Sequence, residues 1–571
     1  MKQHTWPVLG LVIFAFVILC QNAIPQIDSN GQSIEGFWEG EFMPGNNLTL
    51  ILTFHQENDG TIGRILLFQA SVQIQDDPLT DIKLTKNLLS FVIAAKNTPF
   101  SGTVTSDGLH IAGEFEFPDG SVHPVAVNKV ARPTLGNFAE LTKEPQVSDP
   151  LIKYTTDELH DDFKYLRRQL QNIHPQLYLY TAKENFDELF ENTLQSINSA
   201  KTADDFFRLI APVVAQARCV HTGIRLADEF LQATSNRKTR LPLDIKYIDN
   251  KAYIITDYSH NPAIQAGMQV LSINGMSSSN IWQQLVACIP ADGYNQSQKT
   301  FVINNNFSSA YSSYIAHCEQ FDLECLTSTG EKMSVRVTAQ TPGTLEQAIH
   351  QRYPEALTHN SLPMIMQIIN QSKTARLTVK GFWAPDPEQF MSFLQESFSR
   401  LKTENIQNLI LDVRGNKGGH PFFAAELLSY LARSEFIYFE LPEEQGEFAP
   451  LYKPMPYKKD HFTGDIYILM DGGCLSSTGH FLSLVKYHKI ATLIGEESGG
   501  SFYCNDGSIQ VALPNTKIVL NLPQTTFQTA VDGFEKGDPL LPDFEVKPTL
   551  ADVLNGQDVV LDYALQLIQK K

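Results

Sequence analysis

Alternation of apolar and polar residues dominates the chain between residues 33 and 131. The stretch NLTLILTFHQENDGTIGRILLF, residues 47–68, alternates on both sides of an Asp-Gly dipeptide, and two further Asp-Gly dipeptides follow at 107–108 and 119–120. Asp-Gly between alternating runs is a strong hairpin signal, because a tight turn needs residues that tolerate positive φ. Several hairpins in one short stretch predict a small β-rich barrel or sandwich over residues 33–131.

The pattern changes to a helical period after residue 150. Thr155 and Glu158 have the spacing of a capping box that opens a helix. The apolar residues that follow recur at intervals of three and four, namely Leu159, Phe163, Leu166, Leu170 and Ile173. Similar spacing begins again at Phe186 and at Phe206. Residues 150–235 are therefore predicted to be a helical segment, which contains the loop ARCVHTGIRL.

Two more segments complete a multidomain α+β fold. Strand patterns dominate residues 238–342, where QVLSINGMS resembles the middle of a PDZ domain. Residues 343–571 alternate buried strands, such as NLILDV and DIYILM, with helical stretches. This alternation predicts an α/β domain, whose site is expected in the turns that follow the strands.

Composition narrows the functional classes. The chain has 44 Lys and Arg against 63 Asp and Glu, a formal net charge of −19, and no basic run, so nucleic acid is not an expected partner. It has no Gly-rich phosphate loop and no HExxH motif, so neither a cofactor nor a metal is expected. Seven scattered cysteines favour lone thiols, although Cys318 and Cys325 could pair in an oxidising compartment. No pattern favours a particular oligomeric state.

The N-terminus has the pattern of an export signal. Lys2 precedes an apolar run at residues 8–19, which is short for a membrane span and typical of a signal-peptide core. Residues 1–23 are therefore predicted to be a signal peptide, with an uncleaved anchor as the alternative. The mature protein is expected to be extracytoplasmic (periplasmic, cell-surface or secreted), without a stable membrane span. Lipid anchoring at Cys20 is a lesser alternative, because the residues before it are large.

The most informative junction is MDGGCLSSTGHF, residues 470–481, between a buried strand and a helical stretch. A Ser here could simply cap the helix by accepting one of its free N–H groups. It could instead be a nucleophile at the positive end of the helix, with a backbone N–H placed to hold an oxyanion. A second glycine-rich turn, RGNKGG at residues 414–419, follows the preceding buried strand. Two such turns at neighbouring strand ends are the arrangement that acyl transfer requires.

The order LILDVRGNKGG, DIYILMDGGCLSSTGHF and ATLIGEESGGS resembles the tail-specific (C-terminal processing) protease superfamily, over about residues 150 to 570. The resemblance implies a crotonase-like layered sheet, Ser476 as the nucleophile and polypeptide as the substrate. It also implies that the backbone N–H of Ser477, with that of Gly418 or Gly419, holds the oxyanion. The β-rich residues 33–131 lie outside this likeness and resemble a lipocalin-like accessory domain.

The chain departs from the Ser/Lys branch of that superfamily, because Ser501 stands at the position of the general-base Lys. His221 matches instead the histidine of the tricorn-core branch and is the predicted general base, although Val220 replaces the Ser that precedes it there. The same branch has a Glu near the C-terminus, which Glu535 matches. His420 and His480 flank the predicted site and are rival bases.

Together these patterns predict an exported serine peptidase that forms an acyl-enzyme on Ser476 with His221 as general base. The alternative is a catalytically inactive relative that binds peptides or small apolar ligands in the same cleft, which Val220 and the missing Lys would favour. A third hypothesis assigns the function to the N-terminal barrel, as a carbohydrate- or lipid-binding surface protein.

Overall fold

The computed structural model describes residues 34–42, 48–57, 60–69, 72–93, 98–117, 121–130, 151–352, 364–369, 373–384, 387–441 and 446–570. The chain divides into two compact units, Met1–Glu144 and Pro145–Lys571, and each is described by itself. The predicted signal peptide, residues 1–23, lies outside the described residues. No helix in the described ranges is long and apolar enough to cross a membrane.

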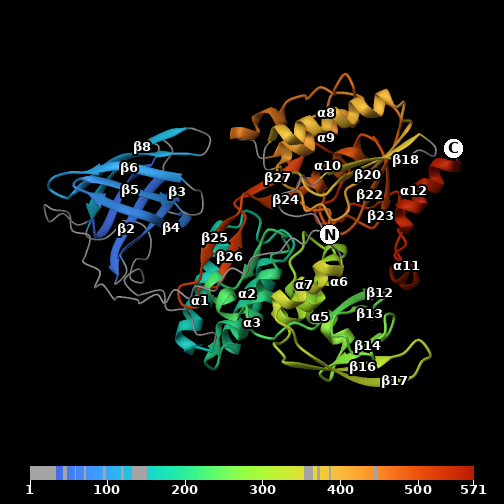
Figure 1. Ribbon diagram of the computed structural model, residues 1–571, viewed down its shortest axis with the longest axis horizontal. Helices are drawn as coiled ribbons and strands as arrows, with labels where there is room; N and C mark the ends of the chain where they lie inside the picture. The colour runs from blue at the N-terminus through green and yellow to red at the C-terminus, as the bar shows by residue number, and fades with distance from the viewer. Residues whose placement is uncertain are drawn as a thin grey trace, which may run out of the picture. The chain divides into compact units, whose positions relative to one another are not determined.

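The first unit is a closed antiparallel β-barrel, which confirms the β-rich prediction and selects the barrel over the sandwich (Figure 1). Each strand pairs with the next in sequence, and the last pairs with the first. Its interior is aromatic, and Phe91 stacks on Phe100 with ring centroids 4.5 Å apart. The strands are β1 (Gly36–Phe42), β2 (Leu48–Glu57), β3 (Gly60–Gln69), β4 (Val72–Thr85), β5 (Leu88–Ile93), β6 (Thr98–Val104), β7 (His110–Glu116) and β8 (Val122–Val130).

The second unit opens with the predicted helices. Thr155 caps the first helix through a complete capping box with Glu158, and Leu159, Phe163, Leu166 and Leu170 are buried along one face. The fully buried Asp162 accepts hydrogen bonds from both Asn515 and Thr516, which ties this helix to the C-terminal part of the chain. The elements are β9 (Lys153–Tyr154), α1 (Thr156–Ile173), α2 (Lys183–Ser196), β10 (Lys201–Thr202), α3 (Ala203–Ala215) and α4 (Asp228–Thr234).

An antiparallel sheet follows over the segment that resembles a PDZ domain. Its strand order is β12-β13-β14-β16-β17, with β15 paired to β14, and α5 and α6 pack on its apolar core. Both Cys318 and Cys325 lie in this part as free thiols, so the possible disulfide between them does not form. The elements are β12 (Leu243–Ile248), β13 (Lys251–Asp257), β14 (Gln269–Ile273), β15 (Met276–Ser277), α5 (Ser278–Cys288), α6 (Ser297–Tyr314), β16 (Gln320–Leu326), β17 (Lys332–Thr338) and α7 (Pro342–Arg352).

The α/β part is built on a six-stranded sheet in the order β18-β19-β20-β22-β23-β28, in which β19 to β28 run parallel and β18 runs antiparallel. Helices α8, α9 and α10 bury their apolar sides in one core cluster with the sheet, and α12 packs in a separate cluster with Ile410 and Leu469. The elements are β18 (Met364–Ile369), β19 (Thr374–Val379), α8 (Pro387–Thr403), β20 (Asn408–Asp412), α9 (Pro421–Leu431), β22 (Asp465–Met470), α10 (Ser477–Tyr487), β23 (Thr492–Gly495), β28 (Phe544–Glu545), α11 (Leu550–Asn555) and α12 (Val559–Lys570).

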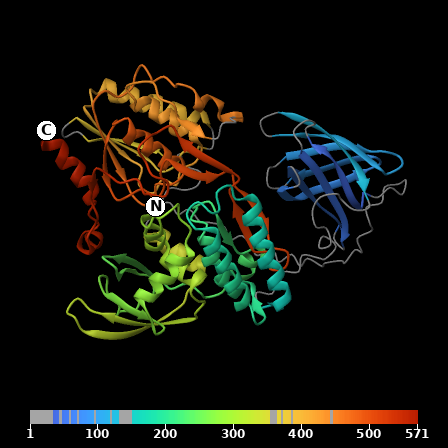
Figure 2. The same ribbon diagram turned by 180° about the vertical axis from the view of Figure 1, so that it is seen from behind.

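A long hairpin connects the α/β part with the helical segment. Its near half pairs β24 (Tyr503–Asp506) with β27 (Thr525–Thr529), and β21 (Phe439–Leu441) adds to β27. Its far half pairs β25 (Ile509–Ala512) with β26 (Val519–Leu522), and β11 (Gly223–Arg225) of the helical segment adds to β26. Both views show this hairpin reaching from the orange and red layers to the green-blue helices (Figures 1 and 2). Through this hairpin, the segment that carries His221 is paired with the part of the chain that carries Ser476.

Candidate active site

Ser476 lies in the turn between β22 and α10 and has an unusual backbone conformation. Its φ of +51° and ψ of −126° fall outside the regions that non-glycine residues prefer, and its exposed fraction is 8%. Its side chain makes no capping hydrogen bond to α10, whereas Thr155, Thr202 and Ser277 each cap a helix with φ between −61° and −68°. The simple capping interpretation of Ser476 is therefore wrong. Conformational strain held in place by surrounding structure is typical of functional sites.

The strained turn is held by hydrogen bonds to its backbone from two neighbouring loops. Asp471 accepts the N–H groups of Gly415 and Gly473 at 2.8 and 2.9 Å. The carbonyl of Cys474 accepts the N–H of Gly500 at 2.8 Å and the hydroxyl of Ser498 at 2.9 Å. These contacts fix the turn from both sides, so the position of the Ser476 side chain is set by backbone that cannot relax freely.

The RGNKGG loop lies directly against Ser476. A Cβ on Gly418, whose φ is +93°, would stand 2.7 Å from the Leu475 carbonyl oxygen, 2.9 Å from the Ser476 Cβ and 3.0 Å from the Ser477 nitrogen. The hydroxyl of Ser477 donates to the Gly419 carbonyl at 2.5 Å, which joins the two turns. Glycine at position 418 is therefore required by close approach as well as by φ.

Asn416 holds this loop and occupies one of its backbone N–H groups, that of Gly418. Its fully buried side chain donates to the Val379 carbonyl at 3.1 Å and accepts the N–H of Gly418 at 2.9 Å. Within the described ranges, the structure records no acceptor for the N–H of Gly419 or for that of Ser477 at the start of α10. The geometry therefore favours Gly419 over Gly418 as the partner of Ser477 in holding an oxyanion.

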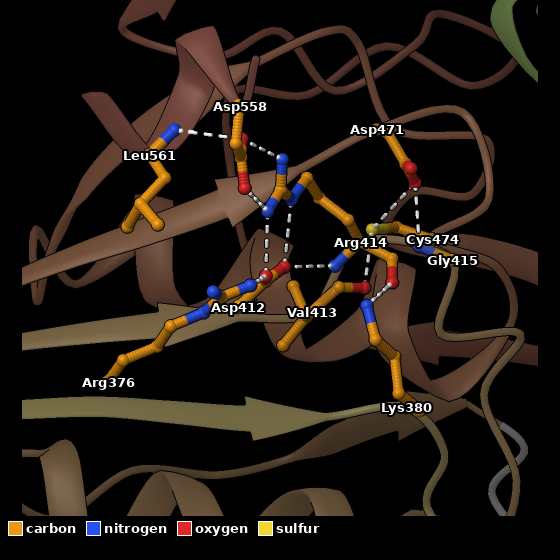
Figure 3. A network of polar contacts seen from close by, with 10 residues as sticks. All are labelled: Arg376, Lys380, Asp412, Val413, Arg414, Gly415, Asp471, Cys474, Asp558 and Leu561. Carbon is orange, nitrogen blue, oxygen red and sulfur yellow. Dashed lines mark hydrogen bonds and ion pairs between the residues drawn. The ribbon is translucent and has the colours of Figure 1, made fainter. Parts of the chain in front are cut away.

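A network of buried ion pairs anchors the start of the RGNKGG loop (Figure 3). The fully buried Asp412 at the end of β20 accepts hydrogen bonds from Arg414 and Arg376, and Arg414 also forms an ion pair with Asp558. Burial alone would raise the pKa of Asp412, but hydrogen bonds and the positive charge of Arg414 hold it well below its usual range. Lys380 donates to the Arg414 carbonyl at 2.8 Å, which ties the loop to the strand beside β20.

His221 reaches the α/β part through the long hairpin. It precedes β11, whose Gly223 pairs with Asn521 of β26, and the Asn521 side chain donates to the His221 carbonyl at 2.6 Å. The ring Nε2 lies 3.3 Å from the Asp506 Oδ2 at the end of β24. The ring is close enough to α10 for its positive charge to lower the pKa of His480, one turn after Ser476. The structure records no hydrogen bond between His221 and Ser476 within its described residues.

The rival bases have structural roles. His480 is buried, its Nε2 lies 3.3 Å from the Cys504 sulfur, and burial, with a contribution from His221, lowers its pKa to about 3. His420 caps α9, because its ring accepts the N–H of Phe422. Lys486 of α10 donates to the Leu541 carbonyl at 2.6 Å. Ser501, at the position of the absent Lys, is buried beside Gly479 of α10.

Glu535 lies in an exposed loop, and the described part of the structure records no hydrogen bond to its side chain. The loop packs closely on the segment next to His221, since a Cβ on Gly537 would stand 2.7 Å from the ring of Tyr180 and Tyr294 donates to the Gly537 carbonyl at 3.0 Å. The structure thus packs the loop of Glu535 on the turn at Gly293, whereas the carboxylate recorded at the His221 ring is that of Asp506.

Two carboxylates near His221 were missed in the sequence. Asp506 faces its Nε2, and Asp292 accepts the N–H of Val220, the preceding residue, at 2.8 Å. Both stand in Asp-Gly dipeptides, which indicate turns and nothing more when read locally. Strand pairing places Asp506 at the imidazole, and the hydrogen bond to Val220 places Asp292 beside the loop that carries it.

Comparison with known proteins shows similarity to peptidases. Residues 373–546 match the sequence profile of Peptidase family S41. The carboxy-terminal processing protease CtpB of Bacillus subtilis (strain 168) is 20% identical over 339 residues, which are 59% of this chain and 58% of that protein. The chain thus aligns with less than two thirds of this relative.

Solved structures of CPAF have a similar fold. Mature CPAF superposes with a TM-score of 0.54 at 13% identity, covering 73% of this chain and 98% of that one. Mature CPAF complexed with lactacystin gives a TM-score of 0.53 at 13% identity, covering 73% and 99%. At this identity the similarity concerns the fold, and it extends well beyond the α/β part.

Proposed function

Because residues 373–546 match peptidase family S41, we propose that the chain is a serine peptidase in which Ser476 is the nucleophile and His221 the general base. The observation that carries this proposal is the strained turn of Ser476. A non-glycine residue with φ of +51° is held against Gly418 by two loops, and its hydroxyl does not cap the helix that it precedes. Such an arrangement makes a hydroxyl available for reaction at a helix N-terminus.

The proposed reaction follows from the groups around this hydroxyl. Oγ of Ser476 attacks the carbonyl carbon of a peptide bond while the neutral imidazole of His221 takes its proton. The carbonyl oxygen becomes an oxyanion that accepts hydrogen bonds from the N–H groups of Ser477 and Gly419. Collapse of this intermediate breaks the C–N bond, and the departing amine takes the proton from His221. Water then attacks the ester with His221 again acting as base, which restores Ser476.

His221 must turn for this reaction. Its Nε2 lies 3.3 Å from Asp506, and no hydrogen bond to Ser476 is recorded in the described residues. The proposed reaction requires a ring nitrogen to leave the partly exposed Asp506 and to reach the hydroxyl of Ser476. The same observation favours a second candidate, an inactive relative that binds peptides in this cleft, and the experiment below separates the two.

The substrate and the cellular location belong to the same proposal. We infer from the similarity to the carboxy-terminal processing protease CtpB that polypeptides are cleaved, and from residues 1–23 that the enzyme acts outside the cytoplasm. The N-terminal barrel is proposed to be a lipocalin-like accessory domain, because it is closed and has an aromatic interior. Deletion of residues 33–131 followed by a cleavage assay tests whether the barrel is needed for the reaction.

The direct test is cleavage of fluorescently labelled, unfolded casein by the purified protein. We expect the wild type to cleave it and Ser476→Ala and His221→Ala to lose activity. Ser483→Ala is the matched control, because Ser483 is a buried serine of the same helix whose hydroxyl bonds to the Gly479 carbonyl. Cleavage by Ser476→Ala at the wild-type rate would refute the assignment. A folded wild type that neither cleaves casein nor reacts with a fluorophosphonate would support the peptide-binding alternative.

A further inference from the structure

The loop that carries His221 is clamped by the segment that follows α5. Oδ1 of Asp292 accepts the N–H of Val220 at 2.8 Å, and the N–H of Gly293 donates to the Arg218 carbonyl at 2.9 Å. Gly293 itself has a φ of +57° and is packed so tightly that a Cβ would stand 2.3 Å from the Cα of Gly537. The carboxylate of Asp292 is therefore held rigidly beside the residue before His221.

Two buried polar atoms at this clamp lack a partner. Oδ2 of Asp292 and Nδ1 of His221 are both shielded from solvent, and neither has a hydrogen-bond partner within the described residues. One is a carboxylate oxygen, which accepts, and the other is a ring nitrogen, which donates in one tautomer. The carboxylate is fixed to the N–H of Val220, the residue directly before His221, and the positive charge of His221 opposes the rise in the pKa of Asp292. A hydrogen bond between them would satisfy both atoms at once.

The alternative partner, Asp506, is less suited to hold the ring. Its side chain is 37% exposed, and its oxygen lies 3.3 Å from Nε2, longer than a strong charge-assisted hydrogen bond. Solvent and salt screen an exposed charge more than a shielded one. Asp506 also faces Nε2, so a hydrogen bond between them would occupy the nitrogen that the proposed reaction needs.

We propose that Asp292 is the positioning residue of His221, with Oδ2 accepting the Nδ1–H of the ring. This bond fixes the tautomer in which Nε2 carries a lone pair, and Nε2 then takes the proton of Ser476. In this tautomer Nε2 has no proton to donate to Asp506, so the 3.3 Å contact between them is not a hydrogen bond of the neutral ring. The inference rests on the proposed function for its catalytic meaning, since it specifies how the general base is held in the correct tautomer.

The electrostatic surroundings of Asp292 are compatible with this role. Burial raises its pKa to about 6, and the positive charge of His221 opposes that shift. At a pH above the pKa of Asp292, the carboxylate is ionised and can accept hydrogen bonds at both oxygens. Four other titratable groups interact with Asp292, namely Asp506, Cys219, Cys504 and Tyr180. Burial raises the pKa of Cys219 to about 12, and it raises the pKa values of Cys504 and Tyr180 as well, so these three groups stay neutral where the peptidase is assayed.

The first test is the tautomer of His221 in the intact wild-type protein. Nitrogen-15 NMR of histidine-labelled protein at pH 8 distinguishes Nδ1–H from Nε2–H, and the His221 signals are assigned by their loss in His221→Gln. We expect the Nδ1–H form. The Nε2–H form, which donates to Asp506, would overturn the proposal whether or not the protein is a peptidase.

The second test compares two isosteric variants. Asp292→Asn presents an amide that can donate to Nδ1, so we expect the ring to change to the Nε2–H tautomer and kcat/KM on labelled casein to fall on the order of 10²–10⁴-fold, mainly in kcat. In Asp506→Asn, the fold decrease in kcat/KM is expected to be at least ten times smaller, and the ring is expected to keep the Nδ1–H tautomer. Both variants are compared with the wild type by urea unfolding.

Three outcomes would overturn the proposal. They are a larger loss in Asp506→Asn than in Asp292→Asn, full activity of a folded Asp292→Asn, and loss of activity in Asp292→Asn without a change of tautomer. If Asp292→Asn does not fold, the wild-type tautomer still decides. Failure of the peptidase assignment is recognised separately, by wild-type cleavage in Ser476→Ala.

Discussion

The contact between Gly418 and the serine turn makes a prediction that needs no knowledge of the natural substrate. In Gly418→Ala the new methyl group would meet the Leu475 carbonyl, the Ser476 Cβ and the Ser477 nitrogen at 2.7, 2.9 and 3.0 Å. None of these is the end of a flexible side chain, so the nucleophile turn or the loop must move. Gly415→Ala is the matched control in the same loop, because its φ is +72° and the nearest atom, Phe301 Cζ, is 3.6 Å away.

The two variants share the penalty of positive φ, which is about 1–2 kcal/mol for an L-residue. Gly418→Ala adds an overpacking penalty of about 1–3 kcal/mol. We therefore expect its free energy of unfolding to fall by about 2–5 kcal/mol, against about 1–2 kcal/mol for Gly415→Ala. A displacement of the nucleophile of several tenths of an ångström should lower the reaction rate by about tenfold to 10²-fold relative to Gly415→Ala.

The assay is the second-order rate of labelling by a fluorophosphonate, measured on samples shown to be folded by urea titration at the same temperature. Labelling does not depend on peptide specificity, so it reports on Ser476, its base and the oxyanion donors alone. If Gly418→Ala reacts as fast as Gly415→Ala, the loop does not support the nucleophile in the way the structure indicates.

Two further predictions concern stability. Asp412→Ala leaves Arg414 and Arg376 without a shared carboxylate and should lower the free energy of unfolding by about 3–5 kcal/mol. Loss of the exposed Asp460–Lys402 pair in Asp460→Ala should change it by at most about 1 kcal/mol. Equal effects of the two variants in urea titration would contradict the buried network. His480 has its pKa lowered to about 3 by burial and by His221, so its contribution to stability is full above the ordinary histidine pKa and is lost as the pH falls toward 3. His480→Asn should therefore lose about 2 kcal/mol less stability than the wild type between pH 6.5 and pH 5, and an unchanged pH dependence would show that His480 does not stay neutral.

Local patterns predicted most of the architecture. Capping boxes, apolar periods and Asp-Gly turns are short-range signals, and they located the barrel, the helices around Thr155 and the two glycine-rich turns of the α/β part. The turn at Ser476 was also predicted, because its glycines and adjacent serines stand in one short stretch, but its positive φ was not.

The surroundings of His221 were not predictable in the same way. Asp506 approaches the ring because β11 adds to the far half of the hairpin and β24 forms its near half, and Asp292 reaches Val220 from 72 positions further along the chain. That register depends on tertiary packing, including the bonds from Asn515 and Thr516 to the buried Asp162. The prediction of Glu535 identified a loop that does lie close to this region, but no sequence pattern shows which of three carboxylates a ring nitrogen will meet.

Identification of the labelled residue would decide the central question most directly. The folded protein is treated with a fluorophosphonate, digested, and mapped by tandem mass spectrometry, with His221→Ala treated in parallel. We expect one phosphonylated residue, Ser476, and markedly slower labelling at that residue in His221→Ala. Modification of a different side chain, or an equal rate in both proteins, would contradict an imidazole-activated serine on the rim of this sheet.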